Sequence, residues 1–411
     1  IDTTKLKFGL NNYFLKSHSF SRKINFLNET EYILGMNWYP NHEIEFEDDD
    51  YNPDGTAVIE LNLHTHRYEQ VIFVSDISFA DGIQFTEVNT DIIASWIEHE
   101  TGLTYGNQFR LAQENQGEFR FHECIDGIKV SPSGFIHVNV DGSGKLTCFS
   151  IHGFYQTNEI ISKDTFHLSL KKIEQLSLDQ LKLIKFPSSD KLIPLYGMEE
   201  IYVTNDGLST IPYDFNNDRR TLMMDKPIYW EDPLHKPFER KEISLDWDVT
   251  MEQALVNEPS PDLVPISETE QEKCTKAVTD FLRQEYPDDT GLWVLKTLYR
   301  DAGYIHVTLR LHQEEATIFH RKLTIIIDPE NLQAINFIDN KPLIDHFSSL
   351  DSSEKVTIPK QEAYEKIKEY FILEPYYVYD FQQQKFILCG RLDCNHGIRA
   401  SNGGILLLDD L

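Results

Sequence analysis

A run of acids is the first place in this sequence where residue types and spacing could do chemistry. Residues 46–55 read FEDDDYNPDG, and Asp50, Asn52 and Asp54 match the first half of an EF-hand loop, in which alternate oxygens converge on Ca²⁺. The twelfth position of that loop should be a bidentate Glu, and here it is Leu61. Asp50, Asn52 and Asp54 are therefore candidate metal ligands, but the pattern favours a polar hairpin tip without a high-affinity calcium site.

Two histidines form a second candidate. His64 and His66 lie two residues apart, so on a strand both would face one side, as metal ligands can. No third ligand stands nearby in the sequence, and the pair falls in a predicted turn. We interpret them as exposed turn histidines.

The sequence CGRLDCNH contains the last candidate group, Cys389, Cys394 and His396. A structural zinc site takes four ligands, and no second pair accompanies these three. Cys389 follows an apolar strand pattern and is predicted to be a core residue. The sequence also lacks a G-x-S-x-G elbow, a phosphate-binding glycine loop and an H-E-x-x-H motif, so we predict no catalytic residue and no cofactor.

Composition limits the partners. The chain has 411 residues, enough for two or three domains, and a formal net charge of −29, which disfavours nucleic acid and anionic lipid surfaces and favours a basic polypeptide. No apolar run approaches the ~18 residues of a membrane helix, so no membrane insertion is expected. Five scattered cysteines favour a reducing compartment, and we expect a cytoplasmic location. The oligomeric state stays open.

Three stretches of 21 residues align without a gap: 56–76, 133–153 and 320–340. In each, a first arm alternates apolar and polar residues, as a strand with one buried face does. Four turn-like residues follow, opening with Asp-Gly in the second copy and Asp-Pro in the third, and then a second apolar arm. We predict three β-hairpins from a duplicated unit.

A predicted helix precedes each hairpin. Leu6, Leu10 and Phe14 recur at four-residue spacing and predict a first helix. Ser267 with Glu270 forms a capping box, in which each side chain satisfies a free backbone N–H, and predicts the start of another.

An apolar helical face also follows Thr90, and further helices are predicted from Ser169 and from Pro359, each followed by a pair of strands. The unit is therefore helix, antiparallel strands, helix, strands. This order indicates an α+β fold with helices packed on one face of antiparallel sheets. The proline-containing, acidic stretch 257–268 is the expected linker.

The second and third units resemble YcdB/YcdC-type repeat proteins, relatives of the PepSY modules. The resemblance rests on FIHVNVDGSGKLTCFSIHG, KLTIIIDPENLQAINFIDN and a closing strand that enters IRASNGG. It spans most of residues 89–411 and residues 1–88 more weakly. It implies tandem cystatin-like modules and carries no catalytic residues. The expected domains are a partial unit at 1–88 and full units at 89–256 and 267–411.

Two functions of different class follow. The favoured one is a non-enzymatic binding or regulatory protein with PepSY-like repeats that engages a polypeptide, preferentially a basic one. The alternative is a hydrolase or metal-dependent enzyme whose site is assembled from residues distant in sequence. An open cleft with clustered acids or histidines would favour the enzyme.

Overall fold

The computed structural model divides the chain into two compact units, each built from separate stretches of sequence. The first comprises Ile1–Lys163, Trp247–Ser260 and Tyr376–Ile387, and the second comprises Asp164–Asp246, Pro261–Pro375 and Leu388–Leu411. The residues that the structure describes are 1–42, 52–155, 160–162, 164–188, 191–212, 220–244, 249–312, 320–350 and 354–411.

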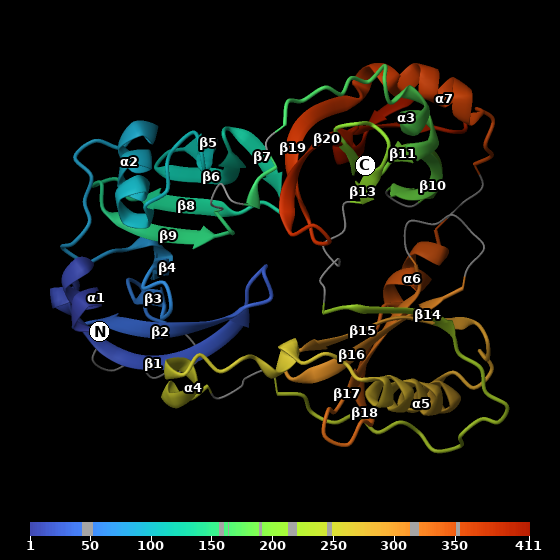
Figure 1. The fold of residues 1–411 in the computed structure, drawn as a ribbon, viewed down its shortest axis with the longest axis horizontal. Coiled ribbons are helices and arrows are strands. Elements are labelled where there is room, and N and C mark those ends of the chain that lie inside the picture. The colour runs from blue at the N-terminus through green and yellow to red at the C-terminus, as the bar shows by residue number, and fades with distance from the viewer. Residues whose placement is uncertain are drawn as a thin grey trace. The chain divides into compact units, whose positions relative to one another are not determined.

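The first unit is mostly strands (Figure 1). Its elements are α1 (Asp2–Lys7), β1 (Tyr13–Ile24), β2 (Thr30–Pro40), β3 (Ala57–Asn62), β4 (Tyr68–Phe73), α2 (Thr90–Thr101), β5 (Phe109–Asn115), β6 (Glu118–Ile125), β7 (Ile128–Ser131), β8 (Phe135–Val140), β9 (Leu146–His152) and α4 (Met251–Leu255). The strands β19 (Ile372–Asp380) and β20 (Lys385–Asp393) contribute their residues from 376 to 387.

The strands of this unit follow one another as β1-β2-β3-β4-β9-β8-β6-β7, and β5 pairs with β6. Neighbours along this path are antiparallel, with β4 joined to β9 through Val71 opposite Phe149. Strand β19 joins β7 in parallel, with Tyr377 opposite Val130. Strands β4 and β9 are separated in the sequence by a long stretch that contains α2.

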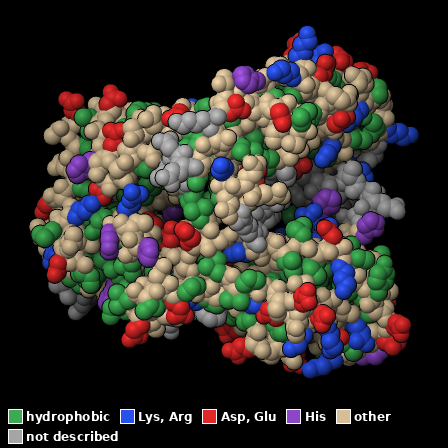
Figure 2. All heavy atoms as spheres, viewed as in Figure 1, with side chains coloured by type: hydrophobic (Ala, Val, Ile, Leu, Met, Phe, Trp, Pro, Cys, Tyr) green, Lys and Arg blue, Asp and Glu red, His purple; other side chains and the backbone are tan. Residues whose placement is uncertain are grey.

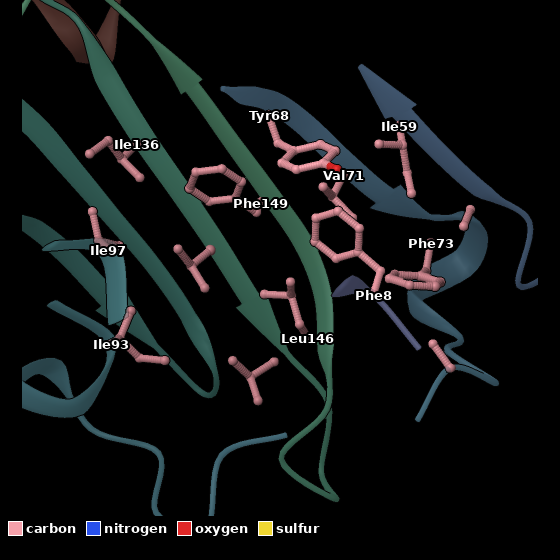
Figure 3. Close-up of a cluster of buried hydrophobic side chains, with 14 of the residues drawn as sticks. Phe8, Ile59, Tyr68, Val71, Phe73, Ile93, Ile97, Ile136, Leu146 and Phe149 are labelled. Atoms are coloured by element: carbon pink, nitrogen blue, oxygen red, sulfur yellow. The ribbon is translucent and has the colours of Figure 1, made fainter. Parts of the chain in front are cut away.

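One buried cluster holds the first unit together (Figure 3). Helix α2 begins where the Asn89 side chain accepts the N–H of Ile92 at 3.0 Å, an N-cap that satisfies a free donor. Ile93 and Ile97, four residues apart, are fully buried in the same cluster as Phe149 of β9. Burying one such aliphatic side chain contributes about 1.5–3 kcal/mol.

The second unit has its own elements (Figure 1). They are α3 (Glu174–Gln180), β10 (Leu181–Ser188), β11 (Lys191–Met198), β12 (Ile201–Thr204), β13 (Thr210–Pro212), β14 (Leu222–Pro227), α5 (Glu268–Glu285), β15 (Trp293–Asp301), β16 (Tyr304–Leu311), β17 (Lys322–Ile327), β18 (Ala334–Asp339), α6 (Lys341–Ser348), α7 (Lys360–Ile367), β21 (His396–Arg399) and β22 (Ile405–Leu407).

Two sheets of this unit are β10-β11-β21-β22 and β14-β15-β16-β17-β18. The longest helix, α5, begins with the predicted capping box: Ser267 Oγ accepts the N–H of Glu270, and the Glu270 carboxylate accepts the N–H of Ser267. Val278 and Phe281 of α5 are buried in one cluster with Leu309 and Ile325 of the second sheet. A separate cluster contains Tyr364 of α7.

All three predicted hairpins are present. They are β3 with β4, β8 with β9, and β17 with β18, each antiparallel. The first turn carries His64–Arg67, and the other two open at Asp141 and Asp328, as the turn residues predicted. In the second turn the Asp141 side chain accepts the N–H groups of Ser143 and Lys145, which fixes the reversal and lowers the pKa of Asp141.

The prediction of a first helix reaching Phe14 is wrong. Helix α1 ends at Lys7, Gly9 adopts a left-handed conformation at φ 62°, and Phe14 lies in β1. A Cβ on Gly9 would also meet the backbone of Gly82 at 2.2 Å, so this glycine is required both by conformation and by close approach. Leu6, placed on the apolar face by the spacing, is 79% exposed.

The chain is a mixed α+β protein with many strands and few helices. The boundary between Ser260 and Pro261 lies inside the stretch 257–268. On one side of it, Ser260 donates its N–H to Thr30 at 2.7 Å in the first unit. On the other, Asp262 accepts the N–H of Gly303 at 3.0 Å in the second. The ranges 1–88, 89–256 and 267–411 stay a prediction. No helix in the described ranges is both long and apolar enough to cross a membrane.

Candidate binding pocket

A pocket of about 450 Å³ lies within the first unit, where several strand ends and turns meet. Its lining comes from the β1–β2 and β3–β4 turns with the adjoining strand ends, from Glu123 of β6, from residues 132–134 before β8, from residues 151–155 at the end of β9 and beyond, and from Phe386 of β20. Its volume is in the range of small-molecule sites. Both charged and aromatic side chains line it.

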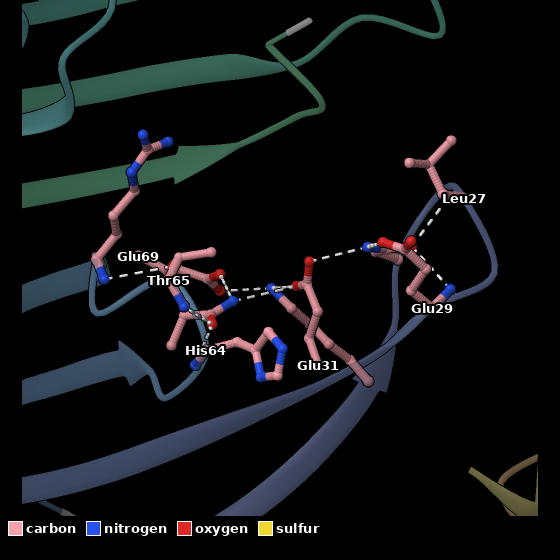
Figure 4. A network of polar contacts seen from close by, with 10 residues as sticks. Leu27, Glu29, Glu31, His64, Thr65 and Glu69 are labelled. Carbon is pink, nitrogen blue, oxygen red and sulfur yellow. Dashed lines mark hydrogen bonds and ion pairs between the residues drawn. The ribbon is translucent and has the colours of Figure 1, made fainter. Parts of the chain in front are cut away.

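Asn62 organises one wall of the pocket. Its side chain is buried, and its Oδ1 accepts the N–H groups of His64 and Thr65 at 3.0 and 3.1 Å, which fixes the β3–β4 turn. Its Nδ2 donates to Glu69 at 2.8 Å and to Glu31 at 3.4 Å (Figure 4). One amide therefore shapes the turn and holds two carboxylates side by side.

The β1–β2 turn lies beside this wall, and the two together form the rim of the pocket, which includes the acids Glu31 and Glu69. Asn25 Oδ1 accepts the N–H groups of Leu27 and Glu29, and Asn25 Nδ2 donates to Glu31 at 3.0 Å and Glu29 at 3.1 Å (Figure 4). Lys23 pairs with Glu69 and lies 3.5 Å from Glu31. Because a carboxylate oxygen has more than one acceptor site, these acids can still receive a donor from a bound group.

Glu123 lies at the buried end of the pocket lining, only 2% exposed. Its carboxylate accepts backbone N–H groups from Tyr155 at 2.7 Å, Gly134 at 3.0 Å and Phe154 at 3.2 Å. Burial raises the pKa of Glu123, and the three N–H bonds oppose that rise. This acid ties the start of β8 to the chain after β9, so its contacts are structural.

Aromatic rings form the other wall. Phe26, Phe154 and Phe386 line the pocket. The ring of Phe26 lies 5.8 Å from that of Phe154, 4.9 Å from that of Tyr379 and 5.0 Å from that of Phe381. Aromatic faces beside carboxylates suit a side chain that is both apolar and cationic, because ring faces attract cations.

The candidate calcium ligands have other partners. Asp50 lies outside the described residues. Asn52 Oδ1 accepts the hydroxyl of Tyr39 at 3.1 Å, and Asp54 Oδ1 accepts the hydroxyl of Ser75 at 2.6 Å. These two oxygens tie the turn before β3 to its neighbours.

The histidines and cysteines singled out in the sequence are not gathered into a ligand set. His64 and His66 are exposed in the β3–β4 turn. Cys389 and Cys394 are buried, and burial raises the pKa of the Cys394 thiol. The His396 ring packs 4.2 Å from that of Tyr370. Within the described stretches, no three His, Cys, Asp or Glu side chains are grouped to hold a metal.

The pocket residues were not identified from the sequence. They are spread from Lys23 to Phe386, and no local spacing connects them. The one usable signal was the pattern Asn-x-His-Thr at 62–65, since an Asn before a turn commonly caps backbone N–H groups.

Comparisons with known proteins assign no family. No protein-family model matches the chain, and no curated protein matches it. Among solved structures, the chain is similar to the Bacillus megaterium YpeB C-terminal domain, with 9% sequence identity, over 82% of this chain and 94% of that chain. The TM-score is 0.25, which is too low to support an argument about fold or function.

Proposed function

We propose that this chain is a non-enzymatic binding protein built from tandem PepSY-like modules of the YcdB/YcdC type, and that it binds an extended polypeptide. The observation that carries the proposal is the position of β1, a 12-residue strand at the edge of its sheet whose last two residues, Lys23 and Ile24, also line the pocket.

An edge strand has backbone groups to offer. Among the described residues, β1 is hydrogen-bonded as a strand to β2 alone, from Tyr13 opposite Pro40 to Ile24 opposite Thr30. The N–H and C=O groups on the other side of an edge strand can pair with an added strand. An extended segment lying along β1 would therefore end beside the pocket and could place a side chain in it.

Charge selects among segments. The net charge of −29 speeds the encounter with basic peptides and opposes acidic ones. Strand β1 itself carries Lys16, Arg22 and Lys23, and Lys23 already pairs with the rim acids Glu31 and Glu69, so the preference for basic segments comes mainly from the net charge of the whole chain. A lysine or arginine side chain seated between those acids and the aromatic wall suits the pocket.

The three matching hairpins support the modular part of the proposal. Each has the same order of first arm, polar turn and second arm, and two of them follow helices with defined N-caps, α2 and α5. Tandem duplication of a helix-and-hairpin module accounts for that recurrence.

The test is binding of a library of random 12-residue peptides, sorted by net charge and measured at ~50 mM and ~300 mM salt. We expect basic peptides to bind best and to weaken as salt rises. Arg22→Glu should strengthen binding of basic peptides about threefold or more, since it replaces a repelling charge with an attracting one.

Arg310→Glu is the matched control, because Arg310 is an exposed arginine on β16, a strand paired on both sides. It should change binding by less than about twofold. Failure of every peptide class to bind would refute the proposal. Cleavage of the peptides would also refute the proposal if one acid or histidine substitution abolished that cleavage. This result would support the enzyme alternative.

A further inference from the structure

A second pocket of about 450 Å³ lies within the second unit, beside the longest helix. One wall is the face of α5 from Lys273 to Gln284, another is the segment 236–241, and a third is the β17–β18 turn at 331–334. Three stretches that are distant in sequence meet here.

Positive charge is concentrated in this pocket, although the chain as a whole is strongly acidic. Its lining includes four lysines, Lys236, Lys241, Lys273 and Lys276. The lining acids are Glu239 and Asp280, and the Asp280 carboxylate lies 3.2 Å from both Lys276 and Arg283. In the described part of the chain, no ion pair forms at Lys236, Lys241 or Lys273.

The lysines are held on ordered backbone. Lys241 donates its N–H to Ile335 of β18 at 2.8 Å, and its carbonyl accepts the side chain of Asn336 at 2.9 Å. Phe238 donates its N–H to Glu285 at 3.0 Å, and its ring packs edge-on against Phe281 at 4.8 Å. The segment is therefore fixed against β18 and α5, and Lys236 and Lys241 are brought to the same pocket as the lysines of α5. Figure 2 shows Lys and Arg side chains gathered on the surface over α5.

Apolar and amide groups complete the lining. Phe238, Ala277 and Leu332 supply apolar surface, and Gln284 and Gln333 supply amides that can donate or accept. A ligand that matches these groups has a compact, highly charged anionic group and an apolar body.

We infer that this pocket binds a small organic phosphate, with the phosphate among the lysines and an apolar or aromatic body against Phe238 and Leu332. Lysine ammonium groups are compact point charges that bind phosphate, and a phosphate monoester carries more negative charge than a carboxylate, so several lysines in one pocket favour it. The volume lies within the range of small-ligand sites. This site is independent of the peptide-binding proposal, because it uses none of the residues of β1 or of the first pocket.

Isothermal titration of the full chain with 1-naphthyl phosphate tests the inference. We expect saturable binding. Three comparison ligands should each bind about tenfold or more weakly: inorganic phosphate, which lacks the apolar body; 1-naphthol, which lacks the charge; and 1-naphthoate, which carries a single-charged carboxylate. Absence of saturable binding of 1-naphthyl phosphate, or equal binding of any comparison ligand, would overturn the assignment.

The double variant Lys273→Ala/Lys276→Ala should weaken binding of 1-naphthyl phosphate about tenfold or more. Both side chains are exposed on α5, so the fold should be retained, and circular dichroism checks this. The control is Lys171→Ala/Lys355→Ala, which removes the same charge from exposed positions outside the pocket and should leave binding within about twofold. Equal loss of binding in both double variants would show a general charge effect and refute the site.

Discussion

The carboxylate of Glu123 accepts the N–H of Gly134 at 3.0 Å, and there is no room between them for a side chain on the glycine. A Cβ at Gly134 would lie 2.5 Å from Glu123 Oε2 and 2.6 Å from both Gly153 Cα and the carbonyl oxygen of His152. Two of these three neighbours are backbone atoms, which cannot rotate away. The buried acid and the bare glycine therefore join the start of β8 to the chain after β9.

Gly134→Ala should lower the free energy of unfolding of the first unit by about 2–3 kcal/mol, because the added methyl group overpacks the junction. Urea denaturation measures this loss of stability, and hydrogen exchange of the β8 and β9 amides shows that it lies in the first unit. Gly142→Ala is the matched control, since nothing lies within 4 Å of a Cβ there. Equal urea midpoints for the two variants would contradict the described junction.

The stability contribution of Glu123 should depend on pH. Burial raises the pKa of Glu123 in the folded state above its unfolded value of about 4.3. As the pH rises past that value, the unfolded chain loses this proton before the folded chain does, so the free energy of unfolding falls until the raised pKa is passed. The free energy of unfolding of the wild-type chain, minus that of Glu123→Gln, should therefore decrease as the pH rises. A difference that does not vary with pH would contradict this.

Glu354 should show the opposite dependence. Hydrogen bonds from Arg399 and Ser401 lower the pKa of Glu354 to about 2. Its stabilising effect should be complete above the unfolded pKa of about 4.3 and decrease as the pH falls toward about 2. Urea unfolding of the wild-type chain and Glu354→Gln should thus differ at neutral pH and converge in acid. Glu369→Gln, at an exposed acid, is the control and should leave the urea midpoint nearly unchanged at neutral pH. If the Glu354→Gln difference persists in acid, the ion pair does not cause it.

Calcium titration should give no submicromolar binding. Asn52 and Asp54 each accept a neighbouring hydroxyl, and the sequence has Leu61 where the loop would need Glu. Asp54→Ala should cost about 1 kcal/mol of stability through the lost bond to Ser75, without changing the titration. Submicromolar binding that disappears in Asp50→Ala or Asp54→Ala would show that a calcium site exists.

Local pattern predicted those elements whose signal is local. Alternating apolar residues predicted the three hairpins, with Asp-Gly and Asp-Pro turns as added evidence for two of them, and the Ser267–Glu270 capping box predicted the start of α5. The same reasoning failed at Phe14, because a four-residue apolar spacing cannot show that Gly9 turns left-handed and packs against Gly82. An apolar spacing along the sequence carries no information about the close approach of these two glycines.

Neither pocket could be predicted, because each depends on pairings between distant segments. Val71 meets Phe149 only when β4 pairs with β9, and this pairing helps bring the β3–β4 turn to the end of β9. Likewise, Lys241 reaches the lysines of α5 only because its backbone bonds to Ile335 of β18. The repeat signal indicated hairpins, but it contained no information on which strands lie next to them.

Hydrogen exchange of β1 tests the central claim most directly, namely that β1 accepts an extended peptide. The full chain is saturated with the basic 12-residue peptide that binds most tightly in the library, and amide exchange is followed by mass spectrometry. Peptide binding should slow the exchange of residues 13–24, as new backbone hydrogen bonds form along the edge, and leave α2 unchanged. If the peptide is saturating and the amide exchange of β1 is unaltered, β1 does not accept the peptide as an added strand.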